Sequence, residues 1–302
     1  MIREGKGLYD YKSGQAIGIK IDYPYEAALL GAVSKAVQVI QRGRFSYTFT
    51  EKESTQPGKK DFCTSVDHDA EKAIVSLLQS RFPKHGIICE EGNAEPWDGV
   101  SPYFTVDGLD GTREFMRGNL RATSSLTAGV NTTKEVICMC IADVVTNETC
   151  SYGPTSSCVV HTSGDIRRAL PHDPKDAEDF SAGRILLRRP LASHRPVVGQ
   201  LVSSFDRYEN TEESLGVWIP RLWKREFRAA VLWHGSTVTP WDITPLIGAS
   251  KKLGYVFLRT ADNGRCLEEF SPEPPTTCHP RGEDVVIVHK NDLCLVKDLV
   301  PA

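Results

Sequence analysis

Apolar residues recur at helical spacing near the start of the chain. A helix is expected over residues 24–42, where one face carries Leu29, Val33, Ala36, Val37 and Ile40. The same spacing predicts a second helix over residues 67–81, which Phe82-Pro83 ends. The first turns of this second helix are acidic, with Asp67, Asp69 and Glu71.

Short apolar runs alternate with turn-forming residues through the middle of the chain. Strands are expected over residues 86–89 and 103–106, and each runs directly into acidic residues. Three further segments, residues 125–130, 135–145 and 157–162, are separated by turn signals and predict an antiparallel meander. Because binding sites are commonly built where strands end, the acidic residues after the first two strands are candidates for function.

The second half of the chain mixes both kinds of pattern. Residues 161–183 are polar and rich in charge, which indicates a surface excursion or a join between two subdomains. Beyond this segment we expect helices over residues 225–233 and 242–253, a proline-rich loop over residues 271–284, and strands over residues 184–190, 254–260 and 284–290.

Composition is that of an ordinary globular protein. Of the 302 residues, 40% are hydrophobic and 25% charged, which allows one large core or two modest ones. The formal net charge of −3 gives no basic field to hold a nucleic-acid polymer. No run approaches the roughly twenty apolar residues that span a bilayer, and no signal-peptide pattern opens the chain. We therefore expect a cytoplasmic protein without a membrane or nucleic-acid partner.

Nine cysteines are scattered along the chain without Cys-x-x-Cys spacing. Several stand beside apolar residues, including Cys138, Cys140 and Cys294. We interpret the cysteines as small buried hydrophobic residues rather than as a disulfide framework or a zinc site.

The chemical signal lies in three acidic segments, which are Glu90-Glu91, residues 107–112 (Asp-Gly-Leu-Asp-Gly-Thr) and Asp242. Hard divalent cations such as Mg²⁺ prefer carboxylate and carbonyl oxygens. Asp107 and Asp110 are three apart around a turn with glycines, so both side chains and the carbonyl between them can face the same ions.

Each acidic segment also has a purely structural interpretation. Aspartate and glycine are common in turns, Glu90-Glu91 fits a solvated charged turn, and Asp242 fits an ordinary helix N-cap. The order of the whole set along the chain is what favours a functional interpretation.

The sequence resembles the inositol monophosphatase superfamily, whose magnesium-dependent phosphatases include inositol monophosphatase, 3′(2′),5′-bisphosphate nucleotidase and histidinol-phosphatase branches. The likeness rests on a Thr-x-x-Asp helix start at residues 64–67, a Phe-Pro-x-x-x-Ile-x-x-Glu-Glu run at residues 82–91, Asp-x-x-Asp-Gly-Thr at residues 107–112 and Trp-Asp at residues 241–242. It extends over nearly the whole chain, since the meander and the last two strands follow the family's pattern.

This resemblance implies an α/β fold, a layered αβαβα sandwich of the inositol monophosphatase and sugar phosphatase type. Residues 1–180 would form an N-terminal α+β subdomain with most metal ligands. Residues 181–302 would form a C-terminal α/β subdomain that contributes Asp242 and the substrate pocket, and the site would lie between them.

The resemblance also implies roles for single residues. Two to three Mg²⁺ ions would be held by Glu90, Asp107, the carbonyl of Leu109, Asp110 and Asp242, with Asp107 as a bridge. Thr112, paired with Asp67, would orient the attacking water, and the N–H groups of Gly111 and Thr112 would bind phosphate.

The implied activity is hydrolysis of a phosphomonoester of a small soluble metabolite by metal-activated water. Metal ions neutralise the charge that repels hydroxide and stabilise the leaving alkoxide, so this ligand set suits the reaction. No covalent nucleophile is needed, and we interpret His194 and His234 as structural or substrate-facing. Homodimers are frequent among such proteins, although no surface pattern in this sequence identifies one.

Several positions depart from the family's pattern. Gly108 stands where proline is common and would loosen the turn, and Cys89 stands where glycine is common. At the segment that usually contacts substrate the chain reads Gly-Val-Trp-Ile, so Trp218 either stacks on a ring of the substrate or belongs to the core. Gly235, followed by Ser236, occupies the place of an acid that contacts inositol.

The substrate is therefore expected to be a nucleotide or sugar-like phosphate. Residues 111–115, Gly-Thr-Arg-Glu-Phe, are similar to the Gly-Thr-Lys-Glu-Phe of bisphosphate nucleotidases. Two alternatives stay open, which are an inositol monophosphatase acting on inositol phosphate and a non-catalytic member with a metal-dependent binding or regulatory role.

Overall fold

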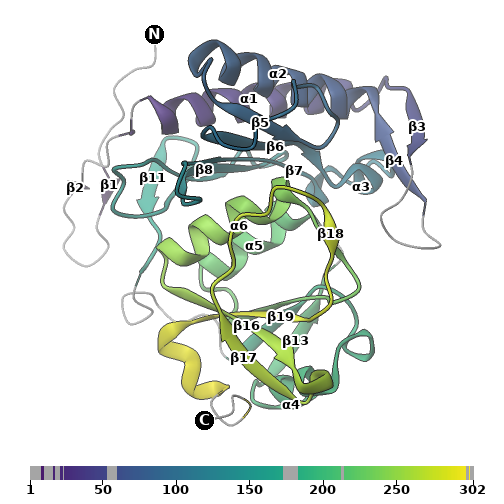
Figure 1. Cartoon of the computed structure of the whole chain (residues 1–302), viewed down its shortest axis with the longest axis vertical. Helices are drawn as coiled ribbons and strands as arrows, with labels where there is room; N and C mark the ends of the chain where they lie inside the picture. The colour runs from purple at the N-terminus through teal and green to yellow at the C-terminus, as the bar shows by residue number, and fades with distance from the viewer. Residues whose placement is uncertain are drawn as a thin grey trace.

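Five layers of alternating helices and sheets stack along the long axis of the molecule (Figure 1). The computed structural model describes residues 8–9, 16–17, 21–22, 24–52, 60–172, 183–211, 214–296 and 299. The boundary expected between residues 180 and 181, and most of the N-terminal segment, lie outside these residues. Three buried apolar clusters fill the spaces between the main layers. The layered α/β architecture expected from the sequence is confirmed.

The two predicted N-terminal helices are confirmed as α1 (Tyr25–Gly43) and α2 (Ser65–Arg81). They lie side by side over one face of the first sheet (Figure 1). A capping box starts α2 two residues earlier than expected, because Thr64 and Asp67 satisfy each other's backbone N–H groups. Asp67 is thereby fixed at the first turn of a buried helix end.

The first sheet has seven strands in the order β11-β10-β9-β8-β7-β6-β5. Every pair is antiparallel except β5 with β6, so the predicted meander is confirmed. Two short strands were not expected, β9 and β11, because their four residues each offer too little alternation to stand out. The strands are β5 (Gly86–Cys89), β6 (Tyr103–Asp110), β7 (Ser124–Val130), β8 (Val136–Asp143), β9 (Thr149–Tyr152), β10 (Val160–Ser163) and β11 (Ile166–Ala169).

The second sheet is mixed, with six strands in the order β13-β12-β14-β19-β16-β17. Strand β12 pairs in parallel with β13 and with β14, and the other pairs are antiparallel. The predicted strands correspond to β12, β16 and β19. The strands are β12 (Arg184–Leu187), β13 (Arg207–Asn210), β14 (Ala229–Leu232), β16 (Tyr255–Ala261), β17 (Cys266–Phe270) and β19 (Val285–His289).

Helices α5 (Leu215–Trp223) and α6 (Pro240–Lys252) lie between the two sheets, and α4 (Pro196–Ser203) packs on the outer face of the second sheet (Figure 1). The helix predicted over residues 242–253 is α6. The remaining short elements are β1 (Leu8–Tyr9), β2 (Ala16–Ile17), β3 (Phe49–Lys52), β4 (Asp61–Thr64), α3 (Thr112–Met116), β15 (Thr237–Val238) and β18 (His279–Pro280).

The helix expected over residues 225–233 is wrong. Residues 229–232 form the central strand β14, and the helix of this region is α5, earlier in the chain. All four residues of β14 are buried, so the strand shows no alternation of apolar and polar positions. Helix α5 was not expected because Pro220 interrupts its sequence.

Burial corrects one interpretation of the cysteines. Cys138 and Cys140 are fully buried in the first sheet, as expected, whereas Cys294 is exposed.

Among the residues described, no helix is both long and apolar enough to cross a bilayer.

Candidate active site

A break in strand β6 brings two of the predicted metal ligands onto one side. Residues three apart in a regular strand point to opposite faces. In β6, however, Asp107 pairs with Leu126 and Asp110 with Ser124, so the register shifts by one residue between them. This bulge turns both aspartates to the same face. The side chain of Leu109 packs instead into the core beneath α1 and α2.

The third aspartate comes from α6, in the layer between the sheets. Asp242 lies in the first turn of this helix, where the hydroxyl of Thr239 donates a hydrogen bond to its Oδ2 at 2.5 Å. The N-cap interpretation therefore fails in detail, since Thr239 is the N-cap. The other oxygen, Oδ1, is buried and has no hydrogen-bond partner among the residues described.

Oxygen atoms of Asp107, Asp110 and Asp242 lie within 4.8 Å of one another. Burial, followed by the charges of Glu90 and the other two aspartates, raises the pKa of Asp107 well above its ordinary value. Burial and the charge of Asp110 likewise raise the pKa of Asp242. Three carboxylates that repel one another, one with a buried oxygen that lacks a partner, fit a hard divalent cation in both charge and donor type.

Asp110 is also held by the neighbouring elements. Its Oδ2 accepts hydrogen bonds from the Gly216 N–H at 3.1 Å and from the Ser124 hydroxyl at 3.3 Å. Gly216 opens α5, so this contact joins the first sheet to the helical layer. The segment that the sequence offered as a substrate contact thus holds a candidate ligand through its backbone.

The predicted pair of Thr112 and Asp67 meets in the structure. The Thr112 hydroxyl donates to Asp67 Oδ1 at 2.6 Å, across 45 positions of sequence. Thr112 starts α3 directly after Gly111, whose φ of +100° suits glycine. A Cβ at Gly111 would also lie 2.5 Å from the Ala122 carbonyl oxygen, so a larger residue does not fit there.

Glu90 and Glu91 follow β5 and share one cation that sequence reasoning missed. Lys52 Nζ lies 2.8 Å from Oε1 of Glu90 and 2.8 Å from Oε1 of Glu91. Burial alone would lower the pKa of Lys52. The charges and hydrogen bonds of the two glutamates together have the larger effect and raise this pKa. Lys52 ends strand β3, and no local pattern of the sequence indicates that it reaches residues 38 positions away.

The loop that carries Glu90 and Glu91 is anchored to α2. Glu71 is fully buried and accepts hydrogen bonds from the N–H groups of Glu91, at 2.8 Å, and of Asn93, at 3.0 Å. The acidic start of α2 seen in the sequence thus has two separate uses, since Asp67 binds Thr112 and Glu71 positions the glutamate loop.

Gly108 packs against α2 rather than loosening a turn, which corrects the expectation from the sequence. A Cβ on Gly108 would lie 2.4 Å from the backbone nitrogen of Glu71 and 2.8 Å from its Cα. The residue sits in the bulge of β6, and glycine allows the strand to approach the helix.

We expect Gly108→Ala to lower the free energy of unfolding by about 1–3 kcal/mol, because backbone atoms cannot move aside for the new methyl group. Urea denaturation of the metal-free protein measures this loss. Gly199→Ala in α4 is the matched control, since nothing lies within 4 Å of a Cβ there. Equal midpoints for both variants would contradict the close packing of Gly108.

The structure separates the residues expected to set substrate specificity. Trp218 is fully buried in the core between the sheets, so the core alternative holds and the stacking alternative does not. Gly235 and Ser236 lie after β14, and Ser236 Oγ accepts a hydrogen bond from Arg281 Nε at 3.2 Å. Burial lowers the pKa of Arg281 to about 10, although the charges of neighbouring acids, Asp242 among them, oppose this shift.

His194 and His234 share a buried partner. Nδ1 of each ring lies near Asp284 Oδ1, at 3.1 and 3.0 Å. Asp284 also accepts the backbone N–H groups of Arg195 and His234, both at 2.7 Å. These contacts join the segments that follow β12 and β14 to the start of β19, which favours a structural role for both histidines.

Asp284→Ala is expected to cost about 3–5 kcal/mol of stability, because several donors lose one buried acceptor. Burial works against the charge of Asp284, but its hydrogen bonds and His194 outweigh it and lower the pKa. A depressed carboxyl pKa stabilises the fold above the unfolded pKa of about 4, and this stability is lost as the pH falls. Urea denaturation from pH 7 to pH 3 measures both effects, with exposed Glu283→Ala as the control. Parallel pH curves for the wild type and Asp284→Ala would contradict this role.

Part of the chain matches a known protein family. Residues 23–159 match the model of the inositol monophosphatase family. The chain is 38% identical over 96 residues to the Nus factor SuhB of Vibrio cholerae, which is 32% of this chain and 35% of that protein. It is 35% identical over 96 residues to inositol monophosphatase 2 of Homo sapiens, which is 31% of this chain and 33% of that protein. The alignments thus span about a third of the length of these curated relatives.

The fold is shared more widely than the sequence. The crystal structure of an IMPase/NADP phosphatase complexed with Mg²⁺ and phosphate superposes with a TM-score of 0.64 at 15% identity. The match covers 87% of this chain and 90% of that one. Residues 23–159 thus match the inositol monophosphatase family, and the chain as a whole shares the layered fold of that structure.

Proposed function

We propose that the protein is a magnesium-dependent phosphomonoesterase that acts on a small phosphorylated metabolite. The observation that carries this proposal is the convergence of Asp107, Asp110 and Asp242 within 4.8 Å. The hydrogen-bonded pair of Thr112 and Asp67 lies nearby, since the charge of Asp67 acts on Asp107. A buried acidic cluster beside an oriented hydroxyl is the arrangement that metal-assisted hydrolysis requires.

The residues that would hold Mg²⁺ are the ones that repel one another in its absence. Asp107, Asp110 and Asp242 would bind it directly, and the carbonyl of Leu109 and the carboxylate of Glu90 would complete the set for two to three ions. Bound there, the ions would supply charge neutralisation at the phosphate and would lower the pKa of water.

The chain's own groups would orient the reactants. Because the Thr112 hydroxyl donates to Asp67, its oxygen keeps lone pairs that can accept a hydrogen bond from the attacking water. As the water attacks phosphorus in line with the leaving oxygen, one of its O–H bonds would break and the proton would pass to Thr112 Oγ1, while the Thr112 hydroxyl proton would pass to Asp67 Oδ1. The N–H groups of Gly111 and Thr112, at the start of α3, would receive a phosphate oxygen.

The substrate class that the surroundings favour is a nucleotide or sugar-like phosphate. Gly235 offers no carboxylate for a polyol, and two cations reach the acidic cluster. Arg188, directly after β12, lowers the pKa of Asp110 and Asp242 against the larger effect of their burial, and the charge of Asp242 in turn acts on Arg281. The positive charges of both arginines would attract a substrate with a second anionic group.

Phosphate release from a panel of substrates tests the proposal. The panel holds adenosine 3′,5′-bisphosphate, inositol 1-phosphate, histidinol phosphate, nucleoside monophosphates and sugar phosphates, each with Mg²⁺ and again with a chelator. We expect chelator-sensitive release with preference for a nucleotide or sugar phosphate. Preference for inositol 1-phosphate would identify the alternative substrate, and no release from any compound would contradict the enzymatic proposal.

The second candidate is a non-catalytic binding or regulatory role. It is favoured by the likeness to a relative that is called a Nus factor rather than a phosphatase. Against it stands the presence of every predicted catalytic and metal-binding residue, with Asp67 and Thr112 in contact. A cell phenotype of a deletion strain separates the two, because a non-catalytic role would be restored by an Asp110→Asn variant as well as by the wild type.

A further inference from the structure

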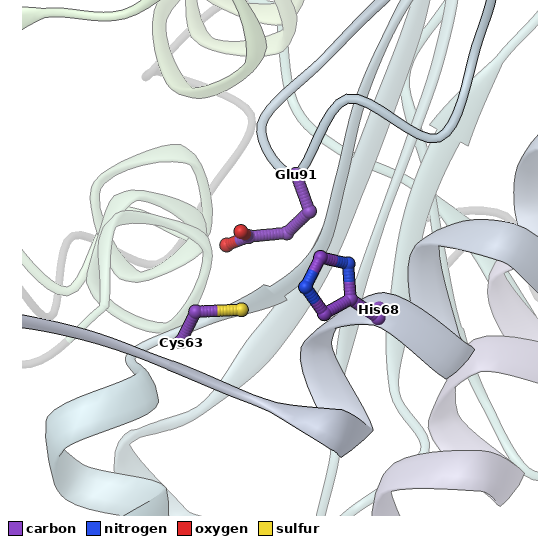
Figure 2. Close-up of side chains that lie close together, drawn as sticks. All are labelled: Cys63, His68 and Glu91. Atoms are coloured by element: carbon purple, nitrogen blue, oxygen red, sulfur yellow. The ribbon is translucent and has the colours of Figure 1, made fainter. Parts of the chain in front are cut away.

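A second group of metal-binding side chains lies beside the carboxylate site. Cys63, His68 and Glu91 each offer one ligand atom, and these three atoms lie within 4.8 Å of one another. Figure 2 shows the thiol, the imidazole and the carboxylate turned toward a common point. None of the three has a part in the hydrolysis proposed above.

The backbone around this group is well fixed. Cys63 is the third residue of β4, and His68 lies in the first turns of α2, directly after the capping box. The Glu91 N–H is held by Glu71 at 2.8 Å, and the side-chain amide of Asn93 donates to the His68 carbonyl at 3.3 Å. Three ligands held on two elements and an anchored loop need little rearrangement to close on an ion.

We propose that Cys63, His68 and Glu91 form a second metal site, selective for a borderline divalent cation of the Zn²⁺ class. Sulfur, imidazole nitrogen and carboxylate oxygen are the donors that zinc prefers, and three protein ligands leave a fourth position for water. Mg²⁺ prefers oxygen ligands alone, so this site and the aspartate cluster select different ions. This proposal departs from the interpretation of the cysteines made from the sequence, which assigned them no zinc site.

An ion can reach this site from solvent, and the proton that the thiol loses on binding is accounted for. The Cys63 side chain is buried, whereas His68 is exposed, so an ion enters past the imidazole. Without metal the Cys63 thiol lies close to the Glu91 carboxylate and donates a hydrogen bond to the Thr64 carbonyl at 3.5 Å. On binding, a sulfur-to-metal bond forms, the S–H bond breaks and its proton leaves to solvent. Lys52 engages only one oxygen of Glu91, Oε1, and a carboxylate has a second oxygen for the ion.

A cation bound at this site would affect the neighbouring carboxylates through Lys52. This lysine divides its hydrogen bonds between Glu90 and Glu91. A cation bound to Glu91 would repel Lys52 and shift this lysine toward Glu90. Glu90 is one of the carboxylates that the proposed magnesium site needs. Zn²⁺ is therefore expected to inhibit phosphate release, a consequence that rests on the proposed function.

Cobalt titration of the full chain tests the site without any assay of activity. Co²⁺ is expected to give a thiolate-to-metal charge-transfer band at one equivalent, and Zn²⁺ is expected to abolish it. Cys63→Ala should lose the band, and His68→Gln should weaken cobalt binding by at least about tenfold. Because His68 is exposed, its variant keeps the fold. The control is Cys278→Ala, an exposed cysteine near Glu90 and Asp242, which should keep the band. No band in the wild type, or an unchanged band in Cys63→Ala, would overturn the site.

The inhibition is tested separately with saturating Mg²⁺. Zn²⁺ should inhibit the wild type and Cys278→Ala alike, and His68→Gln should need at least about tenfold more Zn²⁺. Equal sensitivity of the wild type and His68→Gln would refute the coupling while the cobalt band still reports on the site. Absence of phosphate release before any Zn²⁺ is added would point instead to failure of the proposed function.

Discussion

Asp110→Asn is expected to reduce phosphate release by roughly a thousandfold or more, because loss of one anionic ligand removes several kcal/mol of charge stabilisation at the metal site. The substitution keeps the volume of the side chain, and the remaining oxygen can still accept from the Gly216 N–H. The measurement is kcat on the preferred substrate of the panel at saturating Mg²⁺.

The same variant should be more stable than the wild type when metal is absent. Burial raises the pKa of Asp110 although its hydrogen bonds and Arg188 oppose this, so the ionised form costs stability at neutral pH. A raised carboxyl pKa destabilises the fold as the pH rises through it, and the amide removes that cost. In a melting experiment, Mg²⁺ should raise the Tm of the wild type and hardly change that of Asp110→Asn.

Asp69→Asn serves as the control for both measurements, because Asp69 is an exposed acid on α2 outside the cluster. It should match the wild type in kcat and in its response to Mg²⁺. Near-full activity of Asp110→Asn, or an unchanged Mg²⁺ response, would contradict its assignment as a ligand.

Local patterns were enough to predict the elements that surround the site. Helices α1 and α2 each bury one face, so their apolar residues recur at helical spacing. Strand β14 and helix α5 were missed for different reasons. All four residues of β14 are buried, which removes the alternation on which a strand prediction depends. Helix α5 keeps helical spacing of its buried residues, but Pro220 interrupts its sequence.

The residues of the candidate site also divide into those that the sequence predicted and those that it missed. Spacing alone indicated that Asp107 and Asp110 could act together, but the sequence suggested a turn where the structure has a bulged strand. The partner of Asp67 was correctly expected to be Thr112, because the family resemblance carries information about residues far apart in sequence. Lys52 carries no such motif, and its contact with two glutamates depends on how β3 and the loop after β5 meet in space.

The charges around the site explain why it needs so many supporting contacts. Several carboxylates are held close together, and Asp67, Asp110 and Asp242 each accept at least one hydrogen bond that fixes the direction of the side chain. Such a cluster costs stability until cations arrive, so the supporting layers must supply the difference. The capping box of α2, the buried Glu71 and the contact of Gly108 with the helix all belong to this supporting structure.

Thr112→Val tests whether the hydroxyl, rather than the shape of the side chain, is needed for turnover. Valine has nearly the same volume but cannot donate to Asp67 or accept from water. We expect kcat to fall by about 10²–10⁴-fold, the range for loss of a positioned proton-transfer group, with KM and the Mg²⁺-dependent rise in Tm largely unchanged.

Thr112→Ser is the matched variant, because it restores the hydroxyl on a smaller side chain. It should recover most of the activity that valine loses. A serine variant as inactive as the valine variant would mean that packing of the methyl group, not the hydrogen bond to Asp67, sets the rate. Loss of the Mg²⁺ response in Thr112→Val would instead assign Thr112 to the metal site, which the distances to Asp67 do not require.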